Sequence, residues 1–316
     1  MQQPLGTTTH FLKIKFINPQ TGFITGGGNK ILRTSNSGST WEEIPTVQSI
    51  SEIRDFYFVN QTTGFAVGTY ACCYPLYETH EPVILKTTDS GNNWNEIYRE
   101  NNPANPKILT STMFVNELTG YVTAGYFGFG NNYLFRSTDG GTTWIEFSNI
   151  LVNQFPFDIF FLNETKGISS LYRSLMKTDN GGFNWSEASD LVYNFYDIFF
   201  LNNSTGYITG GELNFGGSSG GRSIILKTTD SGNNWNESLN LSGRKYNLLS
   251  SIHFPSQNIG YSVGTYYPGY PEGDTVSLIF KTTNEGLSWG AQNPNVLYHR
   301  SLISVYFLDD NTGFIV

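Results

Sequence analysis

The 316-residue sequence has little cysteine, little charge and no long apolar run. It holds two Cys, and 14% of its residues are charged, with 26 acidic against 18 basic side chains. The formal net charge of −8 argues against the broadly basic surface that binds nucleic acid or an anionic membrane. No apolar run approaches the roughly 18 residues of a membrane-spanning helix, and no useful helical periodicity occurs. We expect an all-β protein with no nucleic-acid partner, no cofactor and no membrane insertion.

The N-terminal residues Met1-Gln2-Gln3-Pro4 show no signal-peptide pattern. The composition is nevertheless typical of exported bacterial proteins, since Tyr, Asn, Thr and Gly are abundant while Cys and charges are scarce. We therefore expect an extracytoplasmic protein (secreted, at the cell surface or periplasmic) whose leader is not present in this chain. The alternative is a cytoplasmic protein.

What the sequence does contain is a nine-residue phrase that occurs six times. The copies occupy 33–41, 86–94, 136–144, 177–185, 227–235 and 281–289. Each copy begins with Lys or Arg, has Gly three residues before its end, and ends on Trp. These are all the Trp residues of the chain: Trp41, Trp94, Trp144, Trp185, Trp235 and Trp289. Five residues before each Trp stands Asp or Asn: Asn36, Asp89, Asp139, Asn180, Asp230 and Asn284.

The phrase has the chemistry of a hairpin turn between two strands. Asp or Asn bonds backbone amides of the turn, Gly supplies a positive φ, and Trp buries roughly 150–250 Å². Asn replaces Asp in three copies, which favours a structural clasp over a catalytic or metal-binding carboxylate. The phrase resembles the Asp-box, or bacterial neuraminidase repeat (BNR), of the β-propellers found in sialidases, sortilin-type receptors and xyloglucanases.

A second phrase, upstream of each box, occurs seven times. Its copies occupy 14–23, 56–65, 112–121, 159–168, 198–207, 252–261 and 305–314. An alternating apolar run ends at Phe, an Asn-x-x-Thr-Gly-like turn follows, and a residue after Gly, usually aromatic, begins the next strand. The Phe positions are Phe16, Phe58, Phe114, Phe161, Phe200, Phe254 and Phe307. One repeat is thus a four-stranded meander, and Trp-to-Trp spacings of 53, 50, 41, 50 and 54 indicate propeller blades.

Seven first-strand phrases predict a seven-bladed β-propeller of four-stranded antiparallel blades in a single domain, 1–316. The predicted blades are about 12–45, 53–99, 109–149, 156–190, 195–240 and 248–292, with a partial seventh at 302–316. The seventh is incomplete in this chain, because no box or Trp follows Val316. We prefer a chain cut from a longer parent. A natural half-blade, or closure by residues 1–11, is the alternative.

The turns of a meander alternate between its two ends, so the Asn-x-x-Thr-Gly turns and the boxes share one face. The opposite face holds four longer loops, at 70–82, 126–132, 211–222 and 265–276, and function concentrates on such variable loops. Tyr pairs an apolar body with a polar tip, which suits glycans and peptides. The candidate ligand-binding residues are Tyr70, Tyr74, Tyr77, Glu78, Tyr126, Phe127, Phe215, Arg222, Tyr266, Tyr267, Tyr270 and Asp274. The alternative is that these rings pack the loops onto one another.

Enzymatic alternatives rest on scattered residues. A sialidase needs three clustered arginines, and nothing in the sequence gathers three of the Arg residues. A glycosidase needs paired carboxylates, which could come from Asp158, Glu212, Glu272 or Asp274. Cys72 and Cys73 are adjacent, which leaves three alternatives open: free thiols, a vicinal disulfide, or metal capture with Glu78 or His80.

The whole repeat resembles the photosystem II assembly and stability factor family of propellers and its exported bacterial relatives, which often end in a type IX secretion sorting domain. The resemblance covers residues 12–316 and implies the fold, but it transfers no functional residue. The photosynthetic members carry a basic, Arg-rich surface, whereas this chain is acidic. We therefore expect a non-catalytic binding or scaffold propeller that recognises a protein or glycan through its variable loop face. The alternative is a glycoside hydrolase or lyase of the sialidase or xyloglucanase type.

Overall fold

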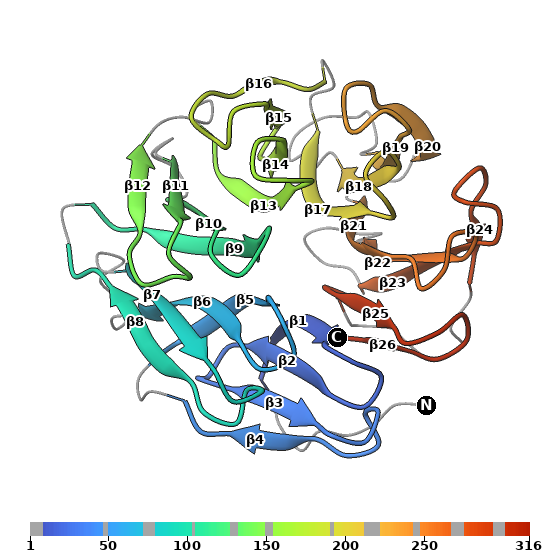
Figure 1. The fold of residues 1–316 in the computed structure, drawn as a ribbon. Coiled ribbons are helices and arrows are strands. Elements are labelled where there is room, and N and C mark those ends of the chain that lie inside the picture. The colour runs from blue at the N-terminus through green and yellow to red at the C-terminus, as the bar shows by residue number, and fades with distance from the viewer. Residues whose placement is uncertain are drawn as a thin grey trace. The chain divides into compact units, whose positions relative to one another are not determined.

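The computed structural model describes most of the chain as antiparallel β-structure (Figure 1). The described residues are 9–46, 50–71, 80–102, 105–126, 132–148, 154–189, 193–211, 222–242, 247–266, 275–292 and 301–316. The chain divides into two compact units, Met1–Asn149 and Ile150–Val316. Across the described ranges, no helix has the length and apolar character needed to cross a membrane.

The first unit contains three four-stranded sheets, each an antiparallel meander. Blade one comprises β1 (Phe11–Phe16), β2 (Gly22–Gly26), β3 (Ile31–Thr34) and β4 (Glu42–Ile44). Blade two comprises β5 (Glu52–Phe58), β6 (Gly64–Ala71), β7 (His80–Thr87) and β8 (Asn95–Arg99). Blade three comprises β9 (Ile108–Phe114), β10 (Gly120–Gly125), β11 (Asn132–Ser137) and β12 (Ile145–Ser148).

The second unit contains three further four-stranded sheets and one two-stranded sheet. Blade four comprises β13 (Pro156–Phe161), β14 (Gly167–Leu171), β15 (Ser174–Thr178) and β16 (Ser186–Glu187). Blade five comprises β17 (Asn194–Phe200), β18 (Gly206–Gly211), β19 (Ser223–Thr228) and β20 (Asn236–Leu241). Blade six comprises β21 (Asn247–His253), β22 (Gly260–Tyr266), β23 (Val276–Thr282) and β24 (Gly290–Ala291). The last sheet pairs β25 (Val305–Phe307) with β26 (Gly313–Ile315).

The prediction of seven blades is therefore wrong, because six sheets have four strands and the seventh has two. The count of seven came from the first-strand phrases, which mark where a blade begins. A blade is completed by its third and fourth strands, which flank the Asp-box. The six boxes and six Trp residues, and not the seven Phe phrases, match the number of four-stranded blades. The prediction of a single domain is not tested by the division into two units.

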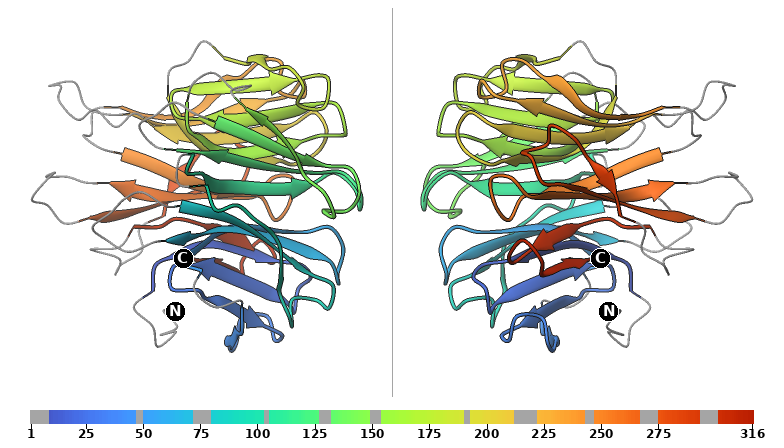
Figure 2. Two further views of the ribbon diagram at one scale, coloured as in Figure 1. Left: turned by 90° about the vertical axis from the view of Figure 1, so that its left-hand side faces the viewer. Right: turned by 90° about the vertical axis from the view of Figure 1, so that its right-hand side faces the viewer.

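In every four-stranded sheet the Asn-x-x-Thr-Gly-like turn and the box turn lie at the same end, as predicted. A backbone amide of each box donates to a carbonyl of the first turn in the same sheet, for example Ser90 N to Thr62 O at 2.9 Å and Gly140 N to Leu118 O at 2.9 Å. We call this the box end of a sheet and the opposite end the loop end. Figure 2 shows the strands of each sheet running side by side between these ends.

Each Trp packs edge-on against the phrase Phe of its own sheet. The six pairs are Phe16–Trp41, Phe58–Trp94, Phe114–Trp144, Phe161–Trp185, Phe200–Trp235 and Phe254–Trp289, with ring centroids 5.7–6.1 Å apart. Trp94 is buried, at 4% exposure, whereas the other five indoles are half-buried. Trp94 is thus the one box Trp that is fully buried, and the other five bury only part of the indole.

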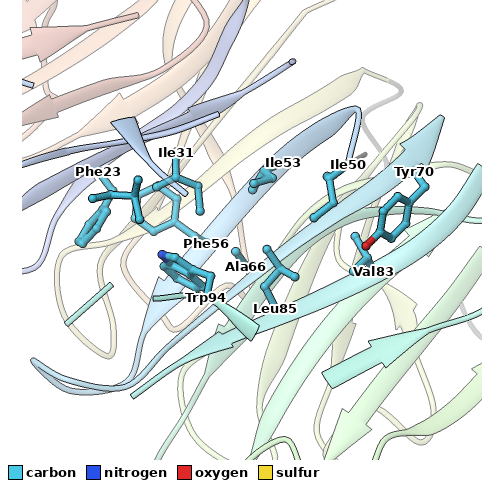
Figure 3. Close-up of a cluster of buried hydrophobic side chains, with 11 residues drawn as sticks. Phe23, Ile31, Ile50, Ile53, Phe56, Ala66, Tyr70, Val83, Leu85 and Trp94 are labelled. Atoms are coloured by element: carbon cyan, nitrogen blue, oxygen red, sulfur yellow. The ribbon is translucent and has the colours of Figure 1, made fainter. Parts of the chain in front are cut away.

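Neighbouring sheets interlock through the residue that follows the phrase Gly. In the first unit, Phe23 of blade one stacks on Phe58 of blade two, with ring centroids 4.9 Å apart. In the second unit, Tyr207 stacks on Phe254 at 4.2 Å. Figure 3 shows the buried side chains between blades one and two, where Phe23, Phe56 and Trp94 form one end of the cluster. At these two positions the aromatic residue after Gly therefore packs one blade against the next within the same unit.

Candidate functional site

The Asp-box turns are structural clasps, as the sequence predicted. In blade two, Oδ1 of Asp89 accepts the backbone N–H of Asn93 at 2.9 Å and the hydroxyl of Thr87 at 2.8 Å. The same Thr87 oxygen accepts the N–H of Gly91 at 3.0 Å. Equivalent bonds to a backbone amide within the turn occur at Asn36, Asp139, Asn180, Asp230 and Asn284, at 2.9–3.0 Å.

These bonds also explain why the box carboxylates stay ionised. Hydrogen bonds from the Asn93 side chain and backbone hold the pKa of Asp89 below its usual range. Hydrogen bonds from Thr143 lower the pKa of Asp139 to about 2. Among the described residues, no group of three or more His, Cys, Asp or Glu side chains is arranged to hold a metal ion.

Each box turn contains two successive left-handed residues, of which the sequence predicted only the second. The box glycines have φ of 70–88°, as at Gly38 and Gly182. The residue before them is also left-handed, and in four boxes it is not glycine: Ser37, Ser90, Ser231 and Glu285, at φ of 55–62°. Such conformations cost a non-glycine residue about 1–2 kcal/mol, so the clasp must compensate for this strain.

In blades two and five, the Lys that opens the box has a role that the sequence did not reveal. Nζ of Lys86 in blade two donates to the carbonyl of Gly140 in the box of blade three, at 2.7 Å. Nζ of Lys227 in blade five donates in the same way to the carbonyl of Glu285 in blade six, at 2.7 Å. Both ammonium groups lie over the aromatic ring that follows the phrase Gly of their own sheet. The box end is therefore occupied by contacts between neighbouring blades.

At the loop end, four of the twelve candidate binding residues can be located. The others lie outside the described residues: Tyr74, Tyr77, Glu78, Phe127, Phe215, Tyr267, Tyr270 and Asp274. So do Cys72 and Cys73, and the glycosidase candidates Glu212 and Glu272.

Tyr70 is placed inside blade two and does not offer its ring to a ligand. It is 8% exposed, its hydroxyl donates to Glu96 at 2.6 Å, and the guanidinium of Arg99 lies 4.1 Å from its ring centroid. Burial and the bond to Glu96 raise the pKa of Tyr70 to about 12. Its surroundings thus support the alternative of rings that pack the loops.

Tyr126 lies at the loop end of the first unit beside a cluster of charges. Its ring centroid is 6.0 Å from that of His80, at the start of β7. Arg54 and Glu52, on β5, form an ion pair at 2.5 Å. Burial, then the charge of Arg54, lowers the pKa of His80, so the imidazole is neutral at pH 7.

The remaining two located candidates, Arg222 and Tyr266, lie in the second unit. Arg222 is exposed, and its guanidinium donates to the hydroxyl of Tyr193 at 3.3 Å. Tyr266 is half-buried against the apolar cluster of blade six.

The second unit also carries a loop-end aromatic surface that the sequence did not single out. The rings of Phe155, Phe157 and Tyr196 form a chain with centroids 5.5 and 4.8 Å apart. Beside them the turn between β14 and β15 holds Tyr172, which is 40% exposed and donates its backbone N–H to Phe155 O at 2.8 Å, and exposed Arg173 at φ 63°. Phe155 is buried, at 7% exposure, and Phe157 and Tyr196 are half-buried, so Tyr172 and Arg173 are the exposed part of this surface.

The carboxylate of Asp158, a glycosidase candidate, accepts hydrogen bonds from backbone amides. It is 9% exposed; Oδ1 accepts its neighbour Ile159 N–H at 2.9 Å, and Oδ2 accepts the N–H of Ile198 in blade five at 2.9 Å. Both oxygens therefore bind backbone amides, and the residue ties the first strands of two blades together.

Asp55 and Asp197 occupy the same position of the repeat as Asp158, and each also accepts a backbone N–H from the first strand of the next blade. Oδ2 of Asp55 accepts Thr112 N–H at 3.0 Å, and Oδ2 of Asp197 accepts Ile252 N–H at 2.8 Å. Burial raises the pKa of Asp55, but the charges of Lys15 and Lys13 outweigh that effect and hold the pKa below its usual value. The sequence signal was an Asp three residues before the phrase Phe, and it marks a link between blades.

Two of the arginines that a sialidase could draw on are engaged in ion pairs. Arg54 pairs with Glu52, and Arg99 pairs with Glu81.

Comparisons with known proteins agree with this geometry. Residues 2–124 match the family described as photosynthesis system II assembly factor YCF48. The structure titled YCF48 bound to D1 peptide matches with a TM-score of 0.66 and 17% identity, over 100% of this chain and 92% of that one. YCF48 from Cyanidioschyzon merolae matches with a TM-score of 0.67 and 16% identity, over 100% and 95%. The chain is a BNR-type β-propeller.

The same propeller fold occurs in an enzyme. The GH74 enzyme of Niastella koreensis matches this propeller with a TM-score of 0.67 and 15% identity, over 90% of this chain and 45% of that one. A search of the curated proteins gives no match. At these identities the structural likeness shows the fold alone, so the function of this propeller is argued from its own surface.

Proposed function

We propose that this propeller is a non-catalytic module, acting outside the cytoplasm, that binds an extended peptide segment of another protein at its loop end. The observation that carries the proposal is the aromatic surface beside the β14–β15 turn, where exposed Tyr172 and Arg173 adjoin the rings of Phe157 and Tyr196. A protein of the same fold is described as bound to a D1 peptide. That description supports a peptide as the kind of ligand.

The chemistry of this surface suits an extended chain. Phenyl and phenol rings take up apolar side chains, and Tyr adds a hydroxyl that can bond a main-chain group. Arg173 adds donors for carbonyl or carboxylate oxygens; no ion pair or hydrogen bond of its side chain occurs among the described residues. The box end offers fewer groups to a peptide, because polar groups there already form hydrogen bonds within a turn or with the neighbouring blade.

A glycoside hydrolase is the second candidate, because the GH74 enzyme shares the fold. Against it stands the use of Asp158, whose two oxygens both accept backbone amides. A general acid or nucleophile needs a carboxyl oxygen that is free to reach the glycosidic bond. A glycan held without turnover would use the same rings and is an outcome of the test.

The test selects binders from a phage-displayed library of random 12-residue peptides and measures the affinity of a synthetic copy by calorimetry. We expect Tyr172→Ala and Arg173→Ala each to weaken binding about tenfold or more. The control is Phe183→Ala, because Phe183 is similarly exposed (51%) but lies in a box turn. In parallel, a panel of polysaccharides is assayed for released reducing ends.

Equal effects of Phe183→Ala and Tyr172→Ala would contradict the choice of surface. Release of reducing ends by the wild-type chain would contradict the choice of class.

A further inference from the structure

The two-stranded sheet β25–β26 is attached to blade six partly through a titratable side chain. His253, the last residue of β21, accepts the backbone N–H of Phe307 at Nδ1, over 3.2 Å. A second bond of the same kind joins Val305 N–H to the hydroxyl oxygen of Ser251, at 3.3 Å. Both donors are main-chain groups of β25, on the side of that strand away from β26.

The bond to His253 requires one protonation state. An imidazole nitrogen accepts a hydrogen bond only while it carries a lone pair, so Nδ1 must be unprotonated and the ring hydrogen must be on Nε2. A proton at Nδ1 would place two N–H donors 3.2 Å apart, with no acceptor between them. The contact therefore exists for neutral His253 and is lost for the imidazolium.

The surroundings of His253 also favour the neutral ring. Its centroid is 4.3 Å from that of Tyr306 on β25 and 5.5 Å from that of Phe199 on β17. Tyr261 lies opposite it on β22, and Tyr207 on β18 lies opposite Phe199. The charge that acts on it is that of Asp197 on β17, which opposes the effect of burial.

Burial prevails, and it lowers the pKa of His253 to about 4, against an ordinary value of 6.5. A histidine released to solvent takes up a proton as pH falls through 6.5, whereas the attached one does not until about pH 4. Attachment of β25 is therefore fully favoured above pH 6.5 and becomes progressively less favourable between pH 6.5 and pH 4.

We propose that His253 is an acid-sensitive latch, whose protonation loosens the β25–β26 sheet from blade six. The stacking of Tyr261 on Phe307, at 3.5 Å, and the bond from Tyr261 Oη to Asp310 O, at 2.7 Å, do not depend on the imidazole. The sheet therefore loosens at the His253 contact, while the six four-stranded blades keep their own hydrogen bonds.

Hydrogen exchange of the whole chain, corrected for the intrinsic effect of pH, measures the latch directly. We expect the protection of the Phe307 amide to fall about tenfold or more between pH 7 and pH 4.5. Amides of β9 and β10 should keep their protection over the same range, because no contact there involves this imidazole.

Two matched substitutions separate the bond from the ring. His253→Asn keeps an acceptor near the position of Nδ1 but cannot titrate, so it should make the protection of Phe307 independent of pH. His253→Phe keeps an aromatic ring against Tyr306 but offers no acceptor, so it should expose the Phe307 amide already at pH 7. His80→Asn, on β7, should leave the wild-type response unchanged.

The latch is excluded if the Phe307 amide of the wild type keeps its protection at pH 4.5. It is also excluded if His253→Asn shows the same loss as the wild type, because the proton would then act on another group.

Discussion

The ammonium group of Lys86 donates a 2.7 Å hydrogen bond to the carbonyl of Gly140, in the box of the following blade. This bond joins one repeat to the next through the carbonyl oxygen of a left-handed residue, at φ 70°. Lys227 and Glu285 reproduce it in the second unit. In blades two and five, the first residue of the Asp-box thus links two blades, in addition to its place in the third strand.

Replacing Lys86 should destabilise the protein through this link. We expect Lys86→Met to lower the free energy of unfolding by about 1.5–3 kcal/mol, because hydrogen bonds to charged groups contribute in that range. Lys30→Met is the control, since its pair with Glu43 is exposed and should contribute less than about 0.5 kcal/mol. Urea titrations followed by circular dichroism give both values, and equal losses would contradict the link.

The box glycine should tolerate no side chain. A Cβ at Gly91 would lie 2.5 Å from the ring of Phe23 in blade one, and its φ is +75°. We expect Gly91→Ala to cost about 3 kcal/mol or more, by strain and by displacement of Phe23. Gly290→Ala serves as the control, because its Cβ would meet nothing closer than 3.9 Å. A melting temperature of Gly91→Ala equal to that of Gly290→Ala would contradict this account.

The six Trp residues should differ in their contribution. Trp94 is 4% exposed, so Trp94→Ala should cost about 3–5 kcal/mol. Trp144→Ala should cost distinctly less, because that indole is half-buried. Chemical denaturation of the two variants would measure the difference, and equal costs would show that burial does not determine it.

Asp89 should matter for its acceptor oxygen more than for its charge. Asp89→Asn keeps Oδ1 for the Asn93 amide and should change stability at pH 7 by no more than about 0.5 kcal/mol, whereas Asp89→Ala should cost about 1 kcal/mol. The pKa of Asp89 is below 3.8 in the folded chain. The wild type should therefore lose stability relative to Asp89→Asn only as pH falls below about 4. Melting curves at pH 7 and pH 3 test both statements.

Much of the fold could be read from the sequence because the repeat is local. A Gly three residues before Trp and an Asp or Asn five before it define a turn whose partners lie within nine residues, and all six turns form as expected. The predicted number of blades was wrong because the seventh phrase, which contains Phe307, forms β25, and only β26 pairs with that strand. A first-strand phrase alone does not reveal whether strands three and four follow.

The candidate site was harder to predict because burial depends on contacts distant in sequence. Tyr70 looked like a loop aromatic, but Arg99 and Glu96 from β8 hold it inside blade two. Tyr172 lies in a short loop, which loop length alone does not mark as a site, although the two-residue turn leaves this ring 40% exposed. The length and composition of the loops therefore predict which end of the sheets carries the candidate site, but they do not predict which aromatic rings are accessible there.

The measurement that tests the central claim most directly is a hydrogen-exchange footprint of the propeller with and without a saturating library-selected peptide. Binding at the loop end predicts new protection in the segment containing Tyr172 and Arg173 and at the start of β17. It predicts no change in the box turns, such as 139–143. Protection confined to those box turns, with the Tyr172 segment unchanged, would contradict the account.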